Sequence, residues 1–249
     1  MSNWLTFADI YGQVSDLIDD ASTDRVTLAK KLVNHAYRDM MNADTMCPLW
    51  FRRKRGSFNT VAGTQAYTDN EAVGGATAGV MATAGITDLG RIVSMSVGGR
   101  PCRGADLNYV DENAVDFWDT SNREDYPKYY LHEVSRYSAV AVTGPPAGNR
   151  TRLFLNTLNF FYTPNSIQAV RLTYEQVFAD LSADTDVPLL PDHYHQALVP
   201  GAMTMMESFG KSALAAMWSS MYLAQKNAMI IENRRQINNY EVPAESGVM

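Results

Sequence analysis

Histidines are the residues of this chain best suited to acid–base or metal chemistry, and there are four of them: His35, His132, His193 and His195. His193 and His195 lie two positions apart, so on a helix they would face different sides. Two histidines that bind zinc from one helix are separated by four positions. His35 lies in an amphipathic segment, where a half-buried structural imidazole is the better interpretation. We therefore expect no metal site among them.

The sequence also lacks the common motifs of catalysis. It contains no GxSxG nucleophile elbow, no GxxxxGK[ST] phosphate loop and no GxGxxG after a strand. The paired carboxylates Asp19-Asp20, Asp111-Glu112 and Glu124-Asp125 are adjacent in sequence, so on a helix they point apart instead of converging on two metal ions. Cys47 and Cys102 show no CxxC spacing. We expect no catalytic residue, no bound metal and no cofactor.

The most concentrated charge in the chain is the basic run Arg52, Arg53, Lys54 and Arg55. Such a run could contact phosphates or an acidic partner. It could equally protect the edge of a β-sheet, because charged side chains there block unwanted strand pairing. The sequence leaves both interpretations open.

Composition indicates a folded, acidic protein. Hydrophobic residues make up 46% and charged residues 19%, and the net charge is −6. That charge disfavours a surface that clamps nucleic acid, since phosphate binding depends on Lys and Arg. No window approaches the roughly 18 apolar residues of a membrane span, and the first residues lack a secretory pattern. We expect a protein that is made in the cytosol and does not contact membranes.

Hydrophobic periodicity predicts two antiparallel helices at the start of the chain. The first covers Thr6–Asp19, with Thr6 as its N-cap, and the second covers about Thr27–Met41. After Trp50 the spacing of apolar residues becomes alternating, which is typical of strands.

The middle of the chain is predicted to be a β region. Gly98-Gly99 supplies the positive φ angles of a two-residue hairpin turn. Residues 70–85 are small and Gly-rich, so we expect a long loop that adds nothing to the core. A short helix is predicted over Asn108–Trp118. Further strand candidates are Lys128–Val134, Tyr137–Thr143, Arg152–Asn156 and Gln168–Val177.

Helical periodicity returns from His193 to about Asn238, with a kink or break expected at Pro200-Gly201. Met203, Met205 and Met206 surround this helix so fully that one buried stripe cannot hold them all, which indicates contact with another subunit. The predicted apolar stripe comprises Leu198, Ala202, Met206, Phe209, Ala213, Met217, Met221, Ala224, Ala228 and Ile231.

These elements predict an α+β fold in which N-terminal and long C-terminal helices form a bundle with an inserted, mostly antiparallel β region. The predicted parts are an N-terminal helical hairpin (1–50), the β region (51–186) with its loop (70–85), C-terminal helices (187–238) and an extended tail (239–249).

Several short segments follow one another in a characteristic order. They are Leu32–Met40, Trp50, Thr60–Tyr67, Ile92–Met95, Tyr126–Tyr130, Val170–Tyr174 and Val187–Pro191. Their order resembles the adaptor, or head-completion, proteins of tailed bacteriophages, especially those with short tails. Within it, the hairpin Thr60–Tyr67 is similar to the TV.GT..Y pattern of that family, and Val187–Pro191 is similar to the entry into its C-terminal helices.

This resemblance implies a structural virion protein at the head–tail junction, assembled in the host cytoplasm and acting in genome packaging and DNA ejection. It implies a homo-oligomeric ring of twelve copies beneath the portal protein, with tail nozzle, hub or fibre proteins on the opposite side. DNA would pass transiently and without sequence specificity through the lumen. The residues expected to contact the portal or another partner are Met203, Met206, Arg234, Arg235, Tyr240, Val242 and Pro243.

Two other functions remain open from the sequence. The chain could be another virion component, such as a tail terminator or a capsid-associated protein. It could also be a metal-dependent nuclease or hydrolase whose carboxylates, Asp111 and Glu112 among them, converge only in three dimensions.

Overall fold

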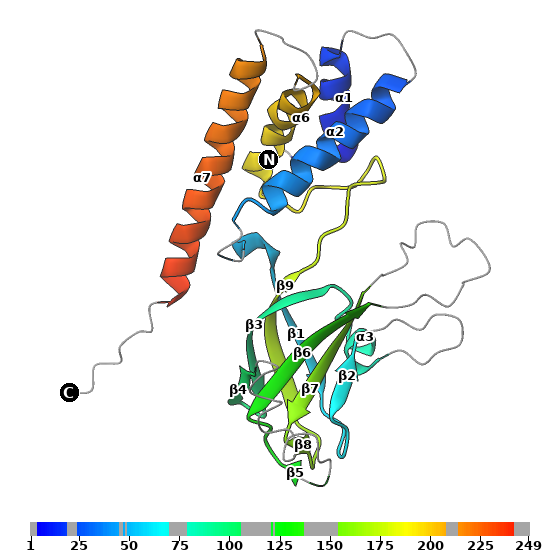
Figure 1. Ribbon diagram of the computed structural model, residues 1–249, viewed down its shortest axis with the longest axis vertical. Coiled ribbons are helices and arrows are strands. Elements are labelled where there is room, and N and C mark those ends of the chain that lie inside the picture. The colour runs from blue at the N-terminus through cyan, green and yellow to red at the C-terminus, as the bar shows by residue number, and fades with distance from the viewer. Residues whose placement is uncertain are drawn as a thin grey trace, which may run out of the picture. The chain divides into compact units, whose positions relative to one another are not determined.

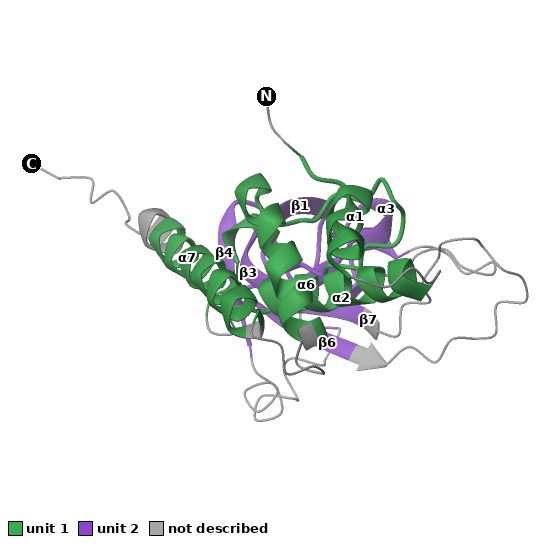
Figure 2. Cartoon of the chain, turned by 90° about the horizontal axis from the view of Figure 1, so that it is seen from above, with its two compact units in different colours: residues 1–52, 178–249 green, residues 53–177 purple. Residues whose placement is uncertain are grey.

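The computed structural model describes residues 4–18, 24–44, 47, 49–69, 79–105, 121, 123–136, 154–207 and 214–241. The chain divides into two compact units, coloured separately in Figure 2. The helical unit comprises residues 1–52 and 178–249, and the β unit comprises residues 53–177.

Helices of both ends of the chain share one core in the helical unit. Figure 1 shows α1, α2 and α6 side by side, with α7 next to α6. The core includes Ile10, Val14, Val33, Met40 and Leu198, all fully or almost fully buried. The elements are α1 (Phe7–Leu17), α2 (Asp24–Met41), the 3-10 turns η1 (Trp50–Arg52) and η2 (Asp192–Ala197), α6 (Leu198–Glu207) and α7 (Ala215–Glu241).

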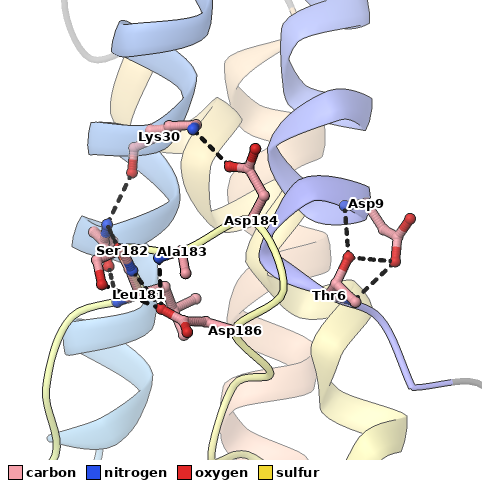
Figure 3. Close-up of polar contacts among 9 residues, drawn as sticks. Thr6, Asp9, Lys30, Leu181, Ser182, Ala183, Asp184 and Asp186 are labelled. Atoms are coloured by element: carbon pink, nitrogen blue, oxygen red, sulfur yellow. Dashed lines mark hydrogen bonds and ion pairs between the residues drawn. The ribbon is translucent and has the colours of Figure 1, made fainter.

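Thr6 caps helix α1, as predicted. Its Oγ1 accepts a hydrogen bond from the Asp9 N–H at 3.3 Å, and the Asp9 carboxylate accepts one from the Thr6 N–H at 2.9 Å (Figure 3). This reciprocal capping box satisfies donors that the helix itself leaves unpaired. The predicted helix is confirmed, with its end at Leu17.

Residues 178–191, which precede η2, form a strap that is hydrogen-bonded to α2. The Asn34 side chain pairs with the main chain of Leu181: its Nδ2 donates to the carbonyl at 2.9 Å, and its Oδ1 accepts from the N–H at 2.8 Å. Lys30 Nζ lies 2.7 Å from the Asp184 carboxylate (Figure 3). Exposed ion pairs of this kind stabilise little, so the pairing with Asn34 contributes most to fixing the strap.

The strap also completes the start of α1. The Phe7 N–H donates to the Asp186 carbonyl at 2.7 Å, and the Ala8 N–H donates to the Asp184 carbonyl at 3.1 Å. These first-turn N–H groups have no acceptor within their own helix. A segment far away in sequence therefore fixes α1 and α2 together.

The expectation that Pro200-Gly201 breaks the helix is wrong. Both residues lie inside α6, which begins at Leu198. Proline is tolerated there because the N–H of a first-turn residue lacks an intrahelical acceptor anyway. Gly201 permits a close approach, since a Cβ on it would lie 2.7 Å from the Tyr222 ring and 2.9 Å from the Ala36 Cβ.

Most strands of the β unit form one seven-stranded sheet with the order β1-β9-β3-β4-β6-β7-β2. All neighbouring pairs in it are antiparallel except β4 and β6, and a separate parallel pair joins β5 and β8. The strands are β1 (Arg53–Asn59), β2 (Ala66–Thr68), β3 (Leu89–Val97), β4 (Arg100–Gly104), β5 (Arg123–Glu124), β6 (Tyr129–Arg136), β7 (Phe154–Phe161), β8 (Thr163–Pro164) and β9 (Ala169–Gln176).

The predicted fold class is therefore wrong. The protein is sheet-rich, with a seven-stranded mixed sheet and only five described α-helices, and it is not a helical bundle with inserted strands. Hydrophobic periodicity is easy to detect in the helices because their repeat is regular. It is harder to detect in β3, because register shifts near Gly90 and Val93 interrupt the alternation. The parallel pairing of β4 with β6 and the long-range pairing of β1 with β9 leave no local signal.

Part of the predicted Gly-rich loop belongs to the core. Helix α3 (Val80–Thr83) places Met81 in the core of the β unit, and Ile86 follows it there. The expectation that residues 70–85 add nothing to the core is wrong for this part. The predicted elements Asn108–Trp118 and Tyr137–Thr143 lie outside the described residues.

The hairpin turn at Gly98-Gly99 is confirmed. Val97 pairs with Arg100, and the two glycines have φ angles of +56° and +81°. A Cβ on Gly98 would lie 2.4 Å from the Tyr126 ring, so glycine is required there for space as well as for conformation.

The segment that resembles a TV.GT..Y pattern forms a self-contained turn between β1 and β2. The buried Tyr67 hydroxyl accepts from the Val61 N–H at 2.9 Å and lies 3.0 Å from the Thr64 carbonyl. Thr60 Oγ1 donates to the Ser166 carbonyl at 2.9 Å. Tyr67 therefore holds the turn together internally, and Thr60 joins the turn to the segment that leads into β9.

A buried polar network in the β unit joins residues of β3, β6 and β7 to Asp69, which directly follows β2. The Asp69 carboxylate accepts from the Asn156 N–H at 2.9 Å and from Asn156 Nδ2 at 2.7 Å. Asn156 Nδ2 also donates to the Leu89 carbonyl at 2.9 Å, and its Oδ1 lies 2.9 Å from His132 Nε2. Because Asp69 and Asn156 are both buried, losing one partner leaves the other without water to replace it.

We predict that Asn156→Ala lowers the free energy of unfolding of the β unit by about 2–3 kcal/mol, because it removes the Nδ2 donor from a buried carboxylate and from the Leu89 carbonyl. Urea denaturation followed by circular dichroism measures the change. The matched control is Asn59→Ala at an exposed strand position, where a change within about 0.5 kcal/mol is expected. Equal losses in the two variants would contradict the importance of the network.

Candidate functional site

Helix α7 buries one face against the rest of the helical unit. Tyr222, Met229 and Asn233 are buried on that face, and Trp218 packs partly buried beside them. In sequence order these positions are separated by four, seven and four residues, which places them on one helix face.

Asp39 of α2 fixes the middle of this face. The Tyr222 hydroxyl donates to its carboxylate at 2.6 Å, and Lys226 Nζ lies 2.7 Å from the same oxygen. Burial, together with the hydrogen bond to Asp39, raises the pKa of Tyr222. Partial burial acts to raise the pKa of Asp39, but the hydrogen bonds from Lys226 and Tyr222 outweigh it and leave that pKa below its ordinary value.

Two further contacts hold the C-terminal half of α7. Asn233 Oδ1 accepts from the Trp50 N–H at 2.9 Å, which joins α7 to η1. The Glu232 carboxylate accepts from the Tyr194 hydroxyl at 2.8 Å and lies 3.2 Å from His193 Nε2, which joins α7 to η2. The rotation of α7 about its own axis is therefore fixed at three levels along its length.

The opposite face of α7 is apolar and exposed. Five residues lie on that face, from Met217 to Ile231, at successive spacings of four, three, four and three positions: Met217, Met221, Ala224, Ala228 and Ile231. The exposed fractions of Met217, Met221 and Ile231 are 45%, 44% and 53%. At about 100° per residue they cover about 80° of the helix surface, centred about 140° from Tyr222 and Met229. We call this set the outward stripe: Met217, Met221, Ala224, Ala228 and Ile231.

The outward stripe belongs to the apolar stripe that the sequence predicted, but it faces away from the core. Leu198 and Ala202 of that prediction are buried in α6 as expected. Helix α6 ends at Glu207 and α7 begins at Ala215, so the two are separate helices and one helical phase does not describe both. The side of α7 that carries Tyr222 and Met229 packs against the core instead. Neither residue was part of the predicted stripe.

A family model for the SU10 adaptor protein matches residues 5–246, which is nearly the whole chain. The chain belongs to the SU10 adaptor protein family. This is a family of phage adaptors, so the chain is a structural component of the virion with a head–tail role. A search of curated proteins found no match.

The interface residues expected for this adaptor occupy different surroundings. Met203 is buried in the core, and Met206 is partly buried against it. Arg234 and Arg235 are exposed on α7. Tyr240 lies within the last turn of α7, whereas Val242 and Pro243 lie outside the described residues.

The basic run of the adaptor is divided between its two units. Arg52, in η1, donates to the Met41 carbonyl at 3.1 Å and lies over the Phe178 ring. Arg53, Lys54 and Arg55 are in β1, which is an end strand of the sheet. That position is the one expected for charges that protect a sheet edge.

The residues considered for chemistry in the sequence have structural roles where the adaptor is described. His195 is buried with Nε2 2.8 Å from the Leu190 carbonyl, and Glu124 pairs with Lys128 at 3.0 Å. Asp19-Asp20 and Asp111-Glu112 lie outside the described residues. Within the described part of the chain, no three His, Cys, Asp or Glu side chains are grouped to hold a metal, and no helix is long and apolar enough to span a membrane.

We predict that Asp39→Asn lowers the free energy of unfolding of the helical unit by about 1 kcal/mol near pH 7, because it weakens the hydrogen bonds that orient α7. The folded-state pKa of Asp39 is depressed, so its contribution is present above the ordinary carboxylate pKa of about 4 and is lost as pH falls. The difference between wild type and variant should therefore shrink in acid.

Urea denaturation at several pH values measures this difference. The control is Asp16→Asn, which changes an exposed carboxylate of α1 and should alter stability by less than about 0.5 kcal/mol at any pH. A difference between wild type and Asp39→Asn that grows in acid would contradict the assigned role.

Proposed function

We propose that the chain is a non-enzymatic head-to-tail adaptor that forms a ring, joins the portal to the tail and lets DNA pass through its lumen. Membership of a phage adaptor family supports a structural role. The observation that carries the ring is the outward stripe of α7, an apolar surface that the described part of the chain does not bury.

A second copy of the chain is the partner that fits the outward stripe best. The five residues of the stripe are uncharged, and Arg235 follows them on the same side of α7, so two acidic chains can approach there without bringing carboxylates together. Ala224 and Ala228 lie at its centre, and small side chains allow helix axes to approach to about 8 Å. The flexible methionines Met217 and Met221 can adapt to an irregular neighbouring surface.

Contacts in this ring are heterologous. The stripe of one copy meets a different surface of the next copy, and such contacts close into a ring when the rotation between copies is right. Five partly exposed side chains offer far less area than the roughly 800 Å² per partner of a standard interface. Isolated chains should therefore remain monomeric and assemble when the portal holds many copies close together.

The segment that follows α7 contacts the portal in this proposal. The sequence predicted an extended tail over residues 239–249, but residues 239–241 still belong to α7. The portal-binding segment therefore begins at Val242. Backbone hydrogen bonds, with side-chain pockets for residues such as Pro243, would supply the affinity, as in other extended peptides bound to a protein surface.

We predict that Met221→Glu prevents ring formation on the portal, because each contact between copies would bury a charge without a partner. The control is Leu223→Glu, since Leu223 is 49% exposed, close to the 44% of Met221, but lies on another face of α7. Mass photometry and electron microscopy of mixtures with purified portal count the bound copies. Wild type and Leu223→Glu should give full rings, and Met221→Glu at most scattered single copies.

Two outcomes of that experiment would contradict parts of the proposal. Full rings of Met221→Glu would exclude the outward stripe as the contact between copies. A wild-type chain that does not form rings on the portal would contradict the adaptor ring itself.

We predict that removal of residues 242–249 weakens portal binding at least about tenfold, which is 1.4 kcal/mol or more, while the circular dichroism and thermal midpoint of the chain stay unchanged. The whole of α7 remains in this variant, so its folded core is intact. Sedimentation with purified portal measures the binding. Normal binding by the shortened chain would contradict the role of this segment.

A further inference from the structure

Half of the large sheet presents a polar face to solvent. Along β1, β9, β3 and β4, alternate residues such as Phe58, Leu172, Met95 and Cys102 are buried in the core of the β unit. Because successive side chains of a strand point to opposite faces, the residues between them share the other face of the sheet.

Strand register aligns basic and hydroxyl side chains on that face. Arg55 pairs with Thr173, which also pairs with Ser94. Ser57 pairs with Arg171, which also pairs with Ser96. We call the set the arginine face: Arg53, Arg55, Arg91, Arg103 and Arg171 with Ser57, Ser94, Ser96, Thr173 and Glu175.

The arginine face has a strong bias of charge. It holds five arginines and one acid in a chain with 21 Lys and Arg against 27 Asp and Glu. A surface that served solubility alone would mix both signs. Within the part of the chain that the structure describes, Arg55, Arg91 and Arg171 are exposed and form no ion pair.

Protection of a sheet edge does not explain this face. It accounts for Arg53 and Arg55, because β1 is an end strand. Arg91 and Arg171 lie on β3 and β9, which are paired on both sides and have no edge to protect. Their charge is available for a ligand.

The composition of the arginine face favours a phosphate backbone over a protein partner. Protein interfaces depend on buried aromatic or aliphatic side chains at their centre. The arginine face contains no aromatic side chain, and the apolar residues beside it include only small ones such as Val93, at a register shift of β3 and 39% exposed, and Val177, just after β9 and 57% exposed. Contacts to DNA phosphates are made by Arg, Ser and Thr side chains, which are the residue types that the register brings together.

We infer that the arginine face binds the phosphodiester backbone of DNA without reading its sequence. The arginine, serine and threonine side chains of this face suit contacts to phosphates, so binding rests on phosphate contacts. This inference rests on the proposed function, in which DNA passes through the ring, and deepens it. From the sequence, nucleic-acid binding was disfavoured because the net charge of the whole chain is negative. That net charge is an average, and the charges are distributed unevenly between the two units.

That segregation follows from a comparison of the two units. The helical unit contains nine Lys and Arg against fifteen Asp and Glu, whereas the β unit contains twelve of each. The whole net charge of −6 therefore belongs to the helical unit. The arginines of the β unit are not outweighed within their own unit, and the register gathers five of them on one face.

Fluorescence anisotropy of a labelled DNA duplex of about 30 base pairs, titrated with the purified chain at several salt concentrations, tests the inference. The double variant Arg55→Gln and Arg171→Gln should bind at least about tenfold more weakly at about 50 mM salt. The slope of log affinity against log salt should fall in magnitude by about 2, because each lost phosphate contact removes about 0.9.

The matched control removes two exposed arginines from the helical unit, Arg234→Gln and Arg235→Gln, and should change the affinity by less than about twofold with an unchanged slope. Equal effects of the two double variants, or no salt-dependent binding by the wild-type chain, would overturn the inference. Labelled poly-glutamate that binds as tightly as DNA and through the same arginines would also overturn it, in favour of an acidic protein partner. None of these results bears on rings formed through α7, which Met221→Glu tests separately.

Discussion

Helix α7 has apolar side chains on two opposite faces, and the helical unit can cover only one of them. The face with Tyr222 and Met229 is buried on the chain's own core, and the outward stripe stays exposed. Contiguous exposed apolar surface lowers the solubility of a monomer, and such surface usually marks an interaction site. Which face remains outside is decided by the contacts of Asp39 and Asn233.

The contacts that orient α7 are themselves prepared by the strap and by α2. Asn34 holds the strap at Leu181, and the strap carbonyls complete the first turn of α1. With α1 and α2 held together, Asp39 is positioned to accept from Tyr222. A structural protein that must present one helix face to its neighbours is well served by such a rigid support, because a site on rigid elements loses little entropy on binding.

Local signals in the sequence predicted local structure well. Thr6 and Asp9 encode a cap, and Gly98-Gly99 encodes a hairpin turn. The overall fold could not be predicted in this way, because strand order depends on pairs far apart in sequence, such as β1 with β9. The proposed interface was half predictable: the spacing of the outward stripe is visible in the sequence, but the side of α7 that faces the core is not. The arginine face needs the register of four strands, β1, β9, β3 and β4, which the sequence does not reveal.

The account depends most on the burial of the outward stripe between neighbouring copies. Electron cryo-microscopy of the chain assembled on its portal tests this directly. The account predicts a ring in which Met217, Met221 and Ile231 of each copy lie in van der Waals contact with the next copy. A ring whose copies meet through other surfaces, with these three side chains still exposed to solvent, would contradict it.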